Sequence, residues 1–175
     1  MCKNFSAGVL LVLTLTFTAC VNKEDEPPMN PTTSAPTKAT PAATPEPEIA
    51  YGQGFFEAER DGANAWRWMT EQGVIRLKNT GKEMKLHLTG AAPVTQLKAS
   101  PTFKVTFNGE PLEEFAAKAE VDKSYVIPAA KQGSGVASEL KISVSQYFVP
   151  KQFDPKSNDE RHLSFQLRQL TWEAK

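Results

Sequence analysis

Cysteine and histidine are scarce in this chain of 175 residues, which contains two of each. Both cysteines, Cys2 and Cys20, lie near the N-terminus. The remaining sequence has no cysteine pair for a disulfide, so its fold must rest on an apolar core. His87 and His162 are too few to build a zinc site, which takes about four nitrogen or sulfur ligands. We expect neither a metal nor a cofactor.

A surplus of charge of one sign is also missing. The 20 basic residues balance the 20 acidic ones, which leaves no electrostatic footprint for nucleic acid and no polybasic patch for a membrane surface. The apolar stretch from Ser6 to Ala19 spans about 14 residues, fewer than the roughly 20 that a membrane-spanning helix needs. We therefore expect no nucleic-acid partner and no transmembrane helix.

The N-terminus has the pattern of a secretory signal that ends in cysteine. Lys3 supplies a positive start, the apolar stretch follows, and Phe17-Thr18-Ala19-Cys20 closes the pattern. This segment resembles the lipobox of bacterial lipoproteins, with Phe17 where leucine is commonest. The resemblance implies that residues 1–19 are a signal peptide and that Cys20 is lipidated after cleavage. An ordinary secretory signal with a chance cysteine is the alternative.

A lipid on Cys20 would hold the mature protein at a membrane, outside the cytoplasm, without a spanning segment. Val21 follows the cysteine, where aspartate is the usual signal for retention in the inner membrane of enteric bacteria. The absence of aspartate favours the outer membrane if the source has one. The membrane is thus the first partner that the sequence predicts.

Residues 20–49 differ in composition from the rest. They contain a charged run at 22–26, then seven prolines among threonine, alanine and serine, and no apolar periodicity. Such a segment buries too little apolar surface to offset its chain entropy, and proline biases it towards extended polyproline II. We expect a disordered tether that lifts a folded domain, residues 50–175, off the membrane.

From Tyr51 onward, apolar and polar residues alternate, which is the period of a half-buried β-strand. The expected strands are residues 54–59, 65–69, 73–79, 84–89, 103–107, 112–115, 124–128, 140–145 and 163–172. A helical turn at 113–119 is an alternative to the strand at 112–115. We expect an all-β fold, an antiparallel β-sandwich of jelly-roll type with about eight or nine strands.

Two local patterns predict how strands end and bend. Asn108-Gly109 directly follows an alternating segment and favours a type I′ hairpin turn. The apolar parity of the last strand shifts from residues 163–167 to residues 170 and 172. One extra residue near Arg168-Gln169 would produce that shift, so we expect a β-bulge there.

The order of short motifs along the domain carries a second resemblance. It runs from Gly54-Phe55-Phe56-Glu57 and Trp66-Arg67-Trp68, through Tyr125-Val126-Ile127-Pro128, to Ser157-Asn158-Asp159-Glu160-Arg161. This order is similar to that of galactose-binding-like sandwich modules, which accompany bacterial glycan-synthesis and cell-surface proteins. The resemblance covers nearly all of the folded domain. It implies a non-catalytic, carbohydrate-binding-like module and carries over no ligand site.

Trp66 and Trp68 share strand parity, so both point to one face and Arg67 points to the other. On an exposed face the indoles would stack on sugar rings. On an inward face they would belong to the core, as large aromatics mostly do, and Arg67 would be the outward residue with binding potential. All three are candidate ligand-binding residues.

The polar connection at residues 148–161 contains two further candidates, Asp159 and Arg161. One interpretation is structural, with the pair fixing the loop to the sheet through charge-assisted hydrogen bonds. Another is ligand binding, which loops on a rigid scaffold often perform. The oxygen donors at 154 and 158–160 are of the kind that calcium takes, but their spacing does not fit an EF-hand.

Catalytic patterns are weak. Gly133-Ser134-Gly135 is not a nucleophile elbow, and Gly52-Gln53-Gly54 lacks the third glycine of a dinucleotide site. Glu57 and Glu59 share a strand face, but such a pair is more typical of a solvated edge than of glycoside cleavage. We expect a non-catalytic envelope lipoprotein that binds glycan or an envelope component. The alternative is a structural or assembly lipoprotein whose sheet contacts another envelope protein.

Overall fold

The computed structural model describes residues 48–97 and 99–175, all within one compact unit, Ala43–Lys175. Cys20, the signal and the expected tether up to residue 47 lie outside the described residues, so lipidation at Cys20 stays a prediction. The described elements are β1 (Ile49–Tyr51), β2 (Phe55–Asp61), β3 (Asn64–Met69), β4 (Gln72–Lys78), β5 (Met84–Ala91), β6 (Thr102–Phe107), β7 (Glu110–Ala116), β8 (Glu120–Ile127), η1 (Ala129–Gln132), β9 (Ala137–Val144), α1 (Pro150–Phe153) and β10 (Phe165–Ala174).

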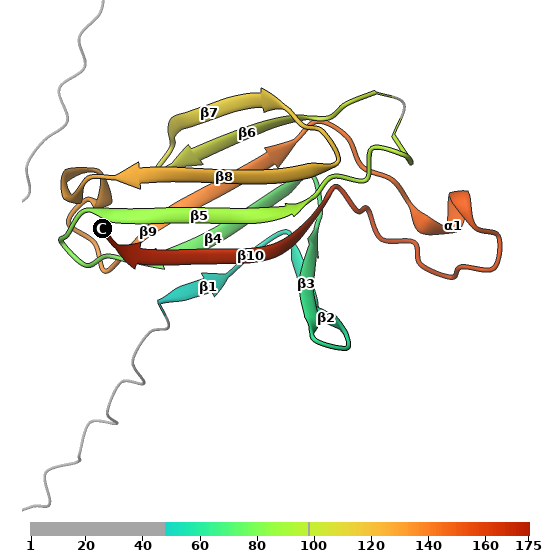
Figure 1. Cartoon of the computed structure of the whole chain (residues 1–175), viewed down its shortest axis with the longest axis horizontal. Helices are drawn as coiled ribbons and strands as arrows, with labels where there is room; N and C mark the ends of the chain where they lie inside the picture. Colours follow the sequence, from blue (N-terminus) through green and yellow to red (C-terminus); the bar gives the residue numbers. More distant parts are fainter. Residues whose placement is uncertain (1–47, 98) are drawn as a thin grey trace, which may run out of the picture. The chain divides into compact units, whose positions relative to one another are not determined.

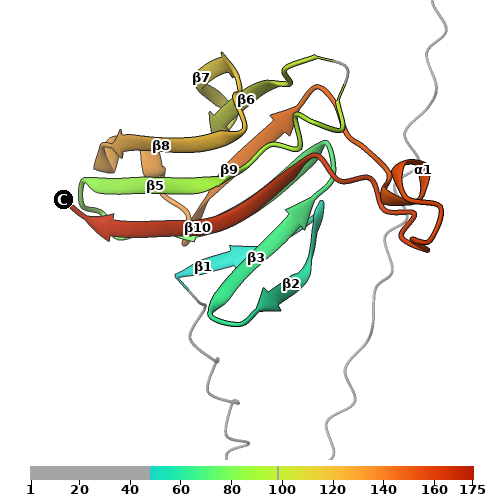
Figure 2. The same cartoon turned by 45° about the vertical axis from the view of Figure 1, so that its right-hand side comes forward.

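The strands form two five-stranded sheets in which neighbours are antiparallel. The β9 sheet has the order β1-β4-β9-β6-β7, and the β10 sheet has the order β2-β3-β10-β5-β8. Figures 1 and 2 show β8, β5 and β10 as one layer, with β9 and β4 behind it. The expected antiparallel β-sandwich is confirmed.

The described residues contain ten strands rather than eight or nine, because β1 was not foreseen. Its three residues are too few to show an alternating pattern beside a proline-rich segment. Ile49, the last residue of the expected tether range, begins β1, pairs with Leu77 of β4 and packs against the core.

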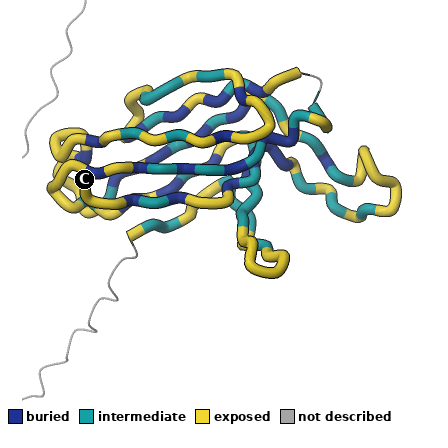
Figure 3. The backbone as a smooth tube through the Cα atoms, in the orientation of Figure 1, coloured by how far each residue is buried: buried dark blue, intermediate teal, exposed yellow. Residues whose placement is uncertain are grey.

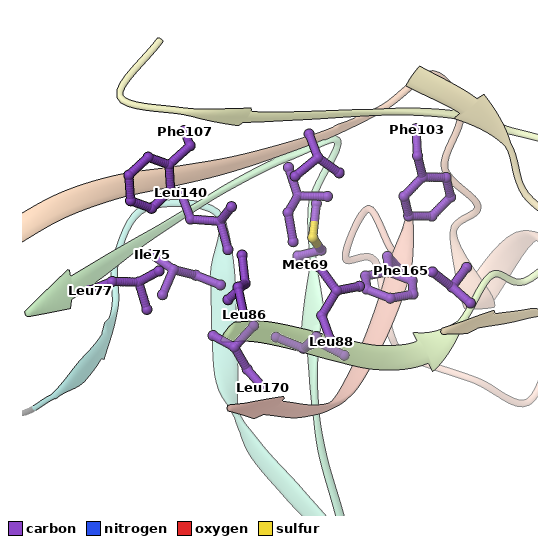
Figure 4. Packing of buried hydrophobic residues seen from close by; sticks show 14 of the residues in the cluster. Met69, Ile75, Leu77, Leu86, Leu88, Phe103, Phe107, Leu140, Phe165 and Leu170 are labelled. Atoms are coloured by element: carbon purple, nitrogen blue, oxygen red, sulfur yellow. The ribbon is translucent and has the colours of Figure 1, made fainter. Parts of the chain in front are cut away.

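Alternating apolar side chains meet between the two sheets. Leu86 and Leu88 of β5 pack in one buried cluster with Ile75 of β4 and Leu140 of β9, and Figure 4 shows this packing. All four side chains are at most 2% exposed, and burying one of this size contributes about 1.5–3 kcal/mol to stability. Figure 3 shows buried and more exposed residues alternating along β5 and β9, so one face of each sheet packs in the core and the other faces outward.

Both expected local features are present. Asn108 and Gly109 have φ angles of 49° and 82°, as a type I′ turn requires, and they join β6 to β7. The pairing of β10 with β5 shifts register between Leu167 and Gln169, which is the predicted bulge. The helical alternative at 113–119 is wrong, because β7 continues as a strand to Ala116 and pairs with β6 along its length.

Candidate functional site

A groove lies where the β2–β3 hairpin leaves its sheet. Figure 1 shows β2 and β3 running crosswise to β10, β5 and β8, although all five belong to one sheet. The pairing of β3 with β10 ends at Arg67 and Leu167, and β10 shifts register directly after Leu167, so the two strands diverge there. The resulting cavity has a volume of about 670 Å³, and we call it the hairpin groove. It is lined by Ala63, Asn64, Ala65, Trp66, Thr89, Gln166, Arg168 and Gln169.

Strand parity explains which side chains of β3 can reach this groove. Met69 is fully buried in the core, so Trp68 and Trp66 project from the opposite, outer face of the β10 sheet. Both are half-buried and neither belongs to the core cluster. The structure separates them, because Trp66 lines the groove whereas Trp68 contacts Phe148 edge-on at 5.9 Å between ring centroids.

Arg67 faces the other way and does not line the hairpin groove. Its guanidinium lies over the Tyr51 ring at 4.7 Å from the centroid, and its Nη1 donates to the Phe56 carbonyl at 3.1 Å. Burial raises the pKa of the Tyr51 hydroxyl, and the charge of Arg67 opposes that shift. These contacts join β3 to β1 and β2, and a ligand role for Arg67 stays a prediction.

Asp159 and Arg161 contact each other, and they connect their loop to β2. The Arg161 Nε and Nη2 donate to the two oxygens of Asp159 at 3.0 and 2.7 Å, and Nη1 donates to Glu59 Oε1 at 2.7 Å. Hydrogen bonding to Arg161 lowers the pKa of Asp159, and the same bonds raise the pKa of Arg161. The structural interpretation requires these contacts; a ligand role for the pair stays a prediction.

Glu59 is the residue whose role sequence reasoning missed. Its second oxygen, Oε2, accepts a hydrogen bond from the Trp66 indole Nε1 at 3.1 Å. The sequence pattern paired it with Glu57, but Glu57 is fully exposed and its carboxylate lies 3.8 Å from Arg67. Glu59 therefore connects the groove to Arg161 and Asp159.

The polar residues of the groove floor were also missed as a set. Thr89 on β5 and Gln166 on β10 occupy outward positions that alternation indicates, and Arg168 and Gln169 follow from the predicted bulge. Arg168 donates to Glu120 at 2.9 Å and to Gln166 at 3.1 Å. No acidic residue lines the groove, so its chemistry combines amide, hydroxyl and guanidinium groups with one indole.

Metal-ligating groups do not gather in the part of the chain that the structure describes: no three possible ligands among His, Cys, Asp and Glu come together there. Asp154, one of the oxygen donors noted in the sequence, accepts a hydrogen bond from the backbone amide of Lys156 at 2.9 Å. Across residues 48–97 and 99–175, no helix is long and apolar enough to cross a membrane.

Comparison with known proteins assigns no family, since no family model and no curated protein matches the chain. Among solved structures, the chain is similar to a family two carbohydrate esterase from Clostridium thermocellum in complex with cellohexaose. The identity is 13% and the TM-score is 0.34, and the match covers 70% of this chain and 30% of the esterase. A similarity this distant assigns neither a function nor a site.

Proposed function

We propose that the protein is a membrane-anchored envelope lipoprotein whose β-sandwich binds a carbohydrate in the hairpin groove without catalysing a reaction. One observation carries this proposal. The half-buried indole of Trp66 lies in a groove whose other polar groups are side chains of Asn64, Thr89, Gln166, Arg168 and Gln169.

A sugar suits this combination of groups. A pyranose ring has an apolar C–H face that stacks on an indole and a rim of hydroxyls that both donate and accept hydrogen bonds. The amides and the hydroxyl of the groove match that rim, because they too donate and accept. The volume of about 670 Å³ falls within the range of small-molecule sites. The absence of acidic lining residues fits a neutral or anionic sugar better than a cationic ligand.

A binding assay on the unlipidated mature chain, residues 21–175, tests this function. The probes are tetrasaccharides of β-1,4-linked glucose, xylose, mannose or N-acetylglucosamine, and soluble peptidoglycan fragments, each titrated by calorimetry. We expect one class to bind and Trp66→Ala to weaken it about 30-fold, the effect of removing a central aromatic anchor worth about 2 kcal/mol.

Tyr147 supplies the matched control, since it is an aromatic residue 42% exposed and outside the groove. Tyr147→Ala should leave the affinity unchanged. Binding that survives Trp66→Ala would move the site elsewhere. Binding of none of these probes would reject the function and favour the alternative, contact with another envelope protein.

The lipid anchor is tested separately. The lipobox-like segment that ends in Cys20 supports it, and the chemistry needs a thiolate, which serine cannot supply. We expect Cys20→Ser to abolish labelling by a palmitate analogue and to leave the signal uncleaved. A labelled serine variant would contradict the lipoprotein proposal and leave the groove proposal standing.

A further inference from the structure

One carboxylate, that of Glu59, accepts hydrogen bonds from two side chains, and one of them, Trp66, lines the hairpin groove. Its Oε1 accepts from Arg161 at 2.7 Å, and its Oε2 accepts from the Trp66 indole at 3.1 Å. Glu59 and Trp66 are opposite each other in the β2–β3 pairing, so their side chains leave the same face about 5 Å apart. The orientation of the carboxylate therefore fixes the direction in which the indole N–H points.

Arg161 is the group that orients this carboxylate. Its planar guanidinium is held on one side by both oxygens of Asp159 and lies over the Phe56 ring, 5.0 Å from the centroid. With the guanidinium plane so fixed, the position of Nη1 is set, and it donates to Glu59 Oε1. The side chains of Arg161, Glu59 and Asp159 are 35%, 33% and 26% exposed, so water competes with these bonds only in part.

The series of hydrogen bonds from Asp159 through Arg161 and Glu59 to Trp66 joins residues that are far apart in the sequence. Arg161 and Glu59 are 102 residues apart, and Arg161 comes from the connection between β9 and β10, whereas Glu59 comes from β2. The loop therefore acts on the hairpin through this contact. Arg161 itself does not line the groove.

We infer that Arg161 is a positioning residue, which holds the Trp66 indole in the hairpin groove through Glu59. The inference rests on the proposed function for its biological meaning, but the geometry it describes exists without a ligand. It also defines what the groove presents. The only hydrogen-bond donor of the indole is occupied by Glu59, so a ligand meets the ring of Trp66 and not its N–H.

The test reads the indole directly by ¹H–¹⁵N spectroscopy of residues 21–175. The chain has three tryptophans, and loss of one indole peak in Trp66→Phe identifies the Trp66 signal. We expect Arg161→Ala to shift that signal and to speed its exchange with water at least tenfold, because the carboxylate loses its orientation. Arg161→Lys should restore part of the protection, since lysine keeps the charge without the planar fork.

Two controls separate positioning from general loosening. The Trp172 indole donates to the Lys78 carbonyl at 2.9 Å in the interior, so its peak should stay unchanged. Lys151→Ala removes a cation of the same loop that pairs with Glu160 and not with Glu59, so it should leave the Trp66 peak in place. If Arg161→Ala does not fold, the Trp66 indole peak is measured instead in Arg161→Lys and Glu59→Gln, in which we also expect it to shift.

Binding of the tetrasaccharides completes the test. We expect Arg161→Ala to lower the affinity for the sugar that binds by about tenfold, which corresponds to the loss of about one charge-assisted hydrogen bond. If the wild type binds none of the sugars, the proposed function fails, and the indole peak still decides the positioning role. An unmoved Trp66 peak in folded Arg161→Ala and Glu59→Gln would overturn the inference, whatever binds.

Discussion

The two sides of the sandwich, where edge strands of the sheets meet, are built differently. On the β7–β8 side, Lys123 donates to Glu113 of the other sheet at 2.5 Å, Tyr125 donates to the same carboxylate at 2.9 Å, and Lys123 lies over the Phe115 ring at 4.0 Å. On the β1–β2 side, Arg67 contacts Tyr51 and β2 bends away. We call these the locked side and the hairpin side.

The contrast relates stability to function. On the locked side, three polar or charged groups join the sheets directly, and burial and the Glu113 charge together raise the pKa of Tyr125. On the hairpin side, the strands leave the sheet, and a loop has to hold them through Arg161. The proposed binding groove thus lies beside a hairpin that a loop supports, and binding elements often come from such locally less stable regions.

The largest expected effect comes from opening the locked side. Glu113→Ala removes the shared partner of Lys123 and Tyr125, which leaves a half-buried cation and a half-buried hydroxyl unpaired. We expect a loss of about 1–3 kcal/mol in the free energy of unfolding, measured by urea denaturation. Glu110→Ala, which removes an exposed partner of Lys131, is the matched control and should cost less than about 0.5 kcal/mol. Equal losses in the two variants would contradict the contrast.

The next effect should be local to the hairpin. Arg161→Ala frees β2 from its loop, so amide exchange should quicken in residues 55–61 while β5 and β9 keep their protection. The global cost should be about 1–2 kcal/mol, and Arg161→Lys should recover part of it. Exchange that rises evenly through both sheets would show that the hairpin is not a separate unit.

The smallest effect is a response to acid that both sides share. Hydrogen bonds to Lys123 lower the pKa of Glu113, and those to Arg161 lower the pKa of Asp159. Carboxyls with lowered folded-state pKa values stabilise above the unfolded value of about 4, and that contribution disappears as the pH falls below it. We expect the melting temperature of Asp159→Asn to fall less than that of the wild type between pH 5 and pH 3. Parallel profiles would contradict this.

Sequence patterns predicted the strands whose alternation the core enforces. β5, β6 and β9 each place apolar residues on one parity, and the turn at Asn108-Gly109 needs only local chemistry. β1 escaped prediction because it is short and depends on β4 for its pairing. Secondary structure was thus predictable where one strand carries its own signal.

The site was predictable only in part. Parity indicated that Trp66 and Trp68 share a face, but which face they take depends on Met69 being in the core. The link from Arg161 to Glu59 spans 102 residues and leaves no local pattern. The groove itself depends on the divergence of β3 from β10 beyond Leu167, which only the assembled sheet reveals.

β1 is the element that a pulling force on the N-terminal side of the domain would detach first. Three residue pairs join it to β4, and the Lys78 amide adds one bond to the Glu48 carbonyl at 2.9 Å. Any tension that arrives from the N-terminal side loads these few bonds first. Because β1 pairs with β4 alone, it can peel away without breaking another ladder. A pulling force on the domain would then detach β1 first, while β6 and β7, at the other end of the strand order, stay paired.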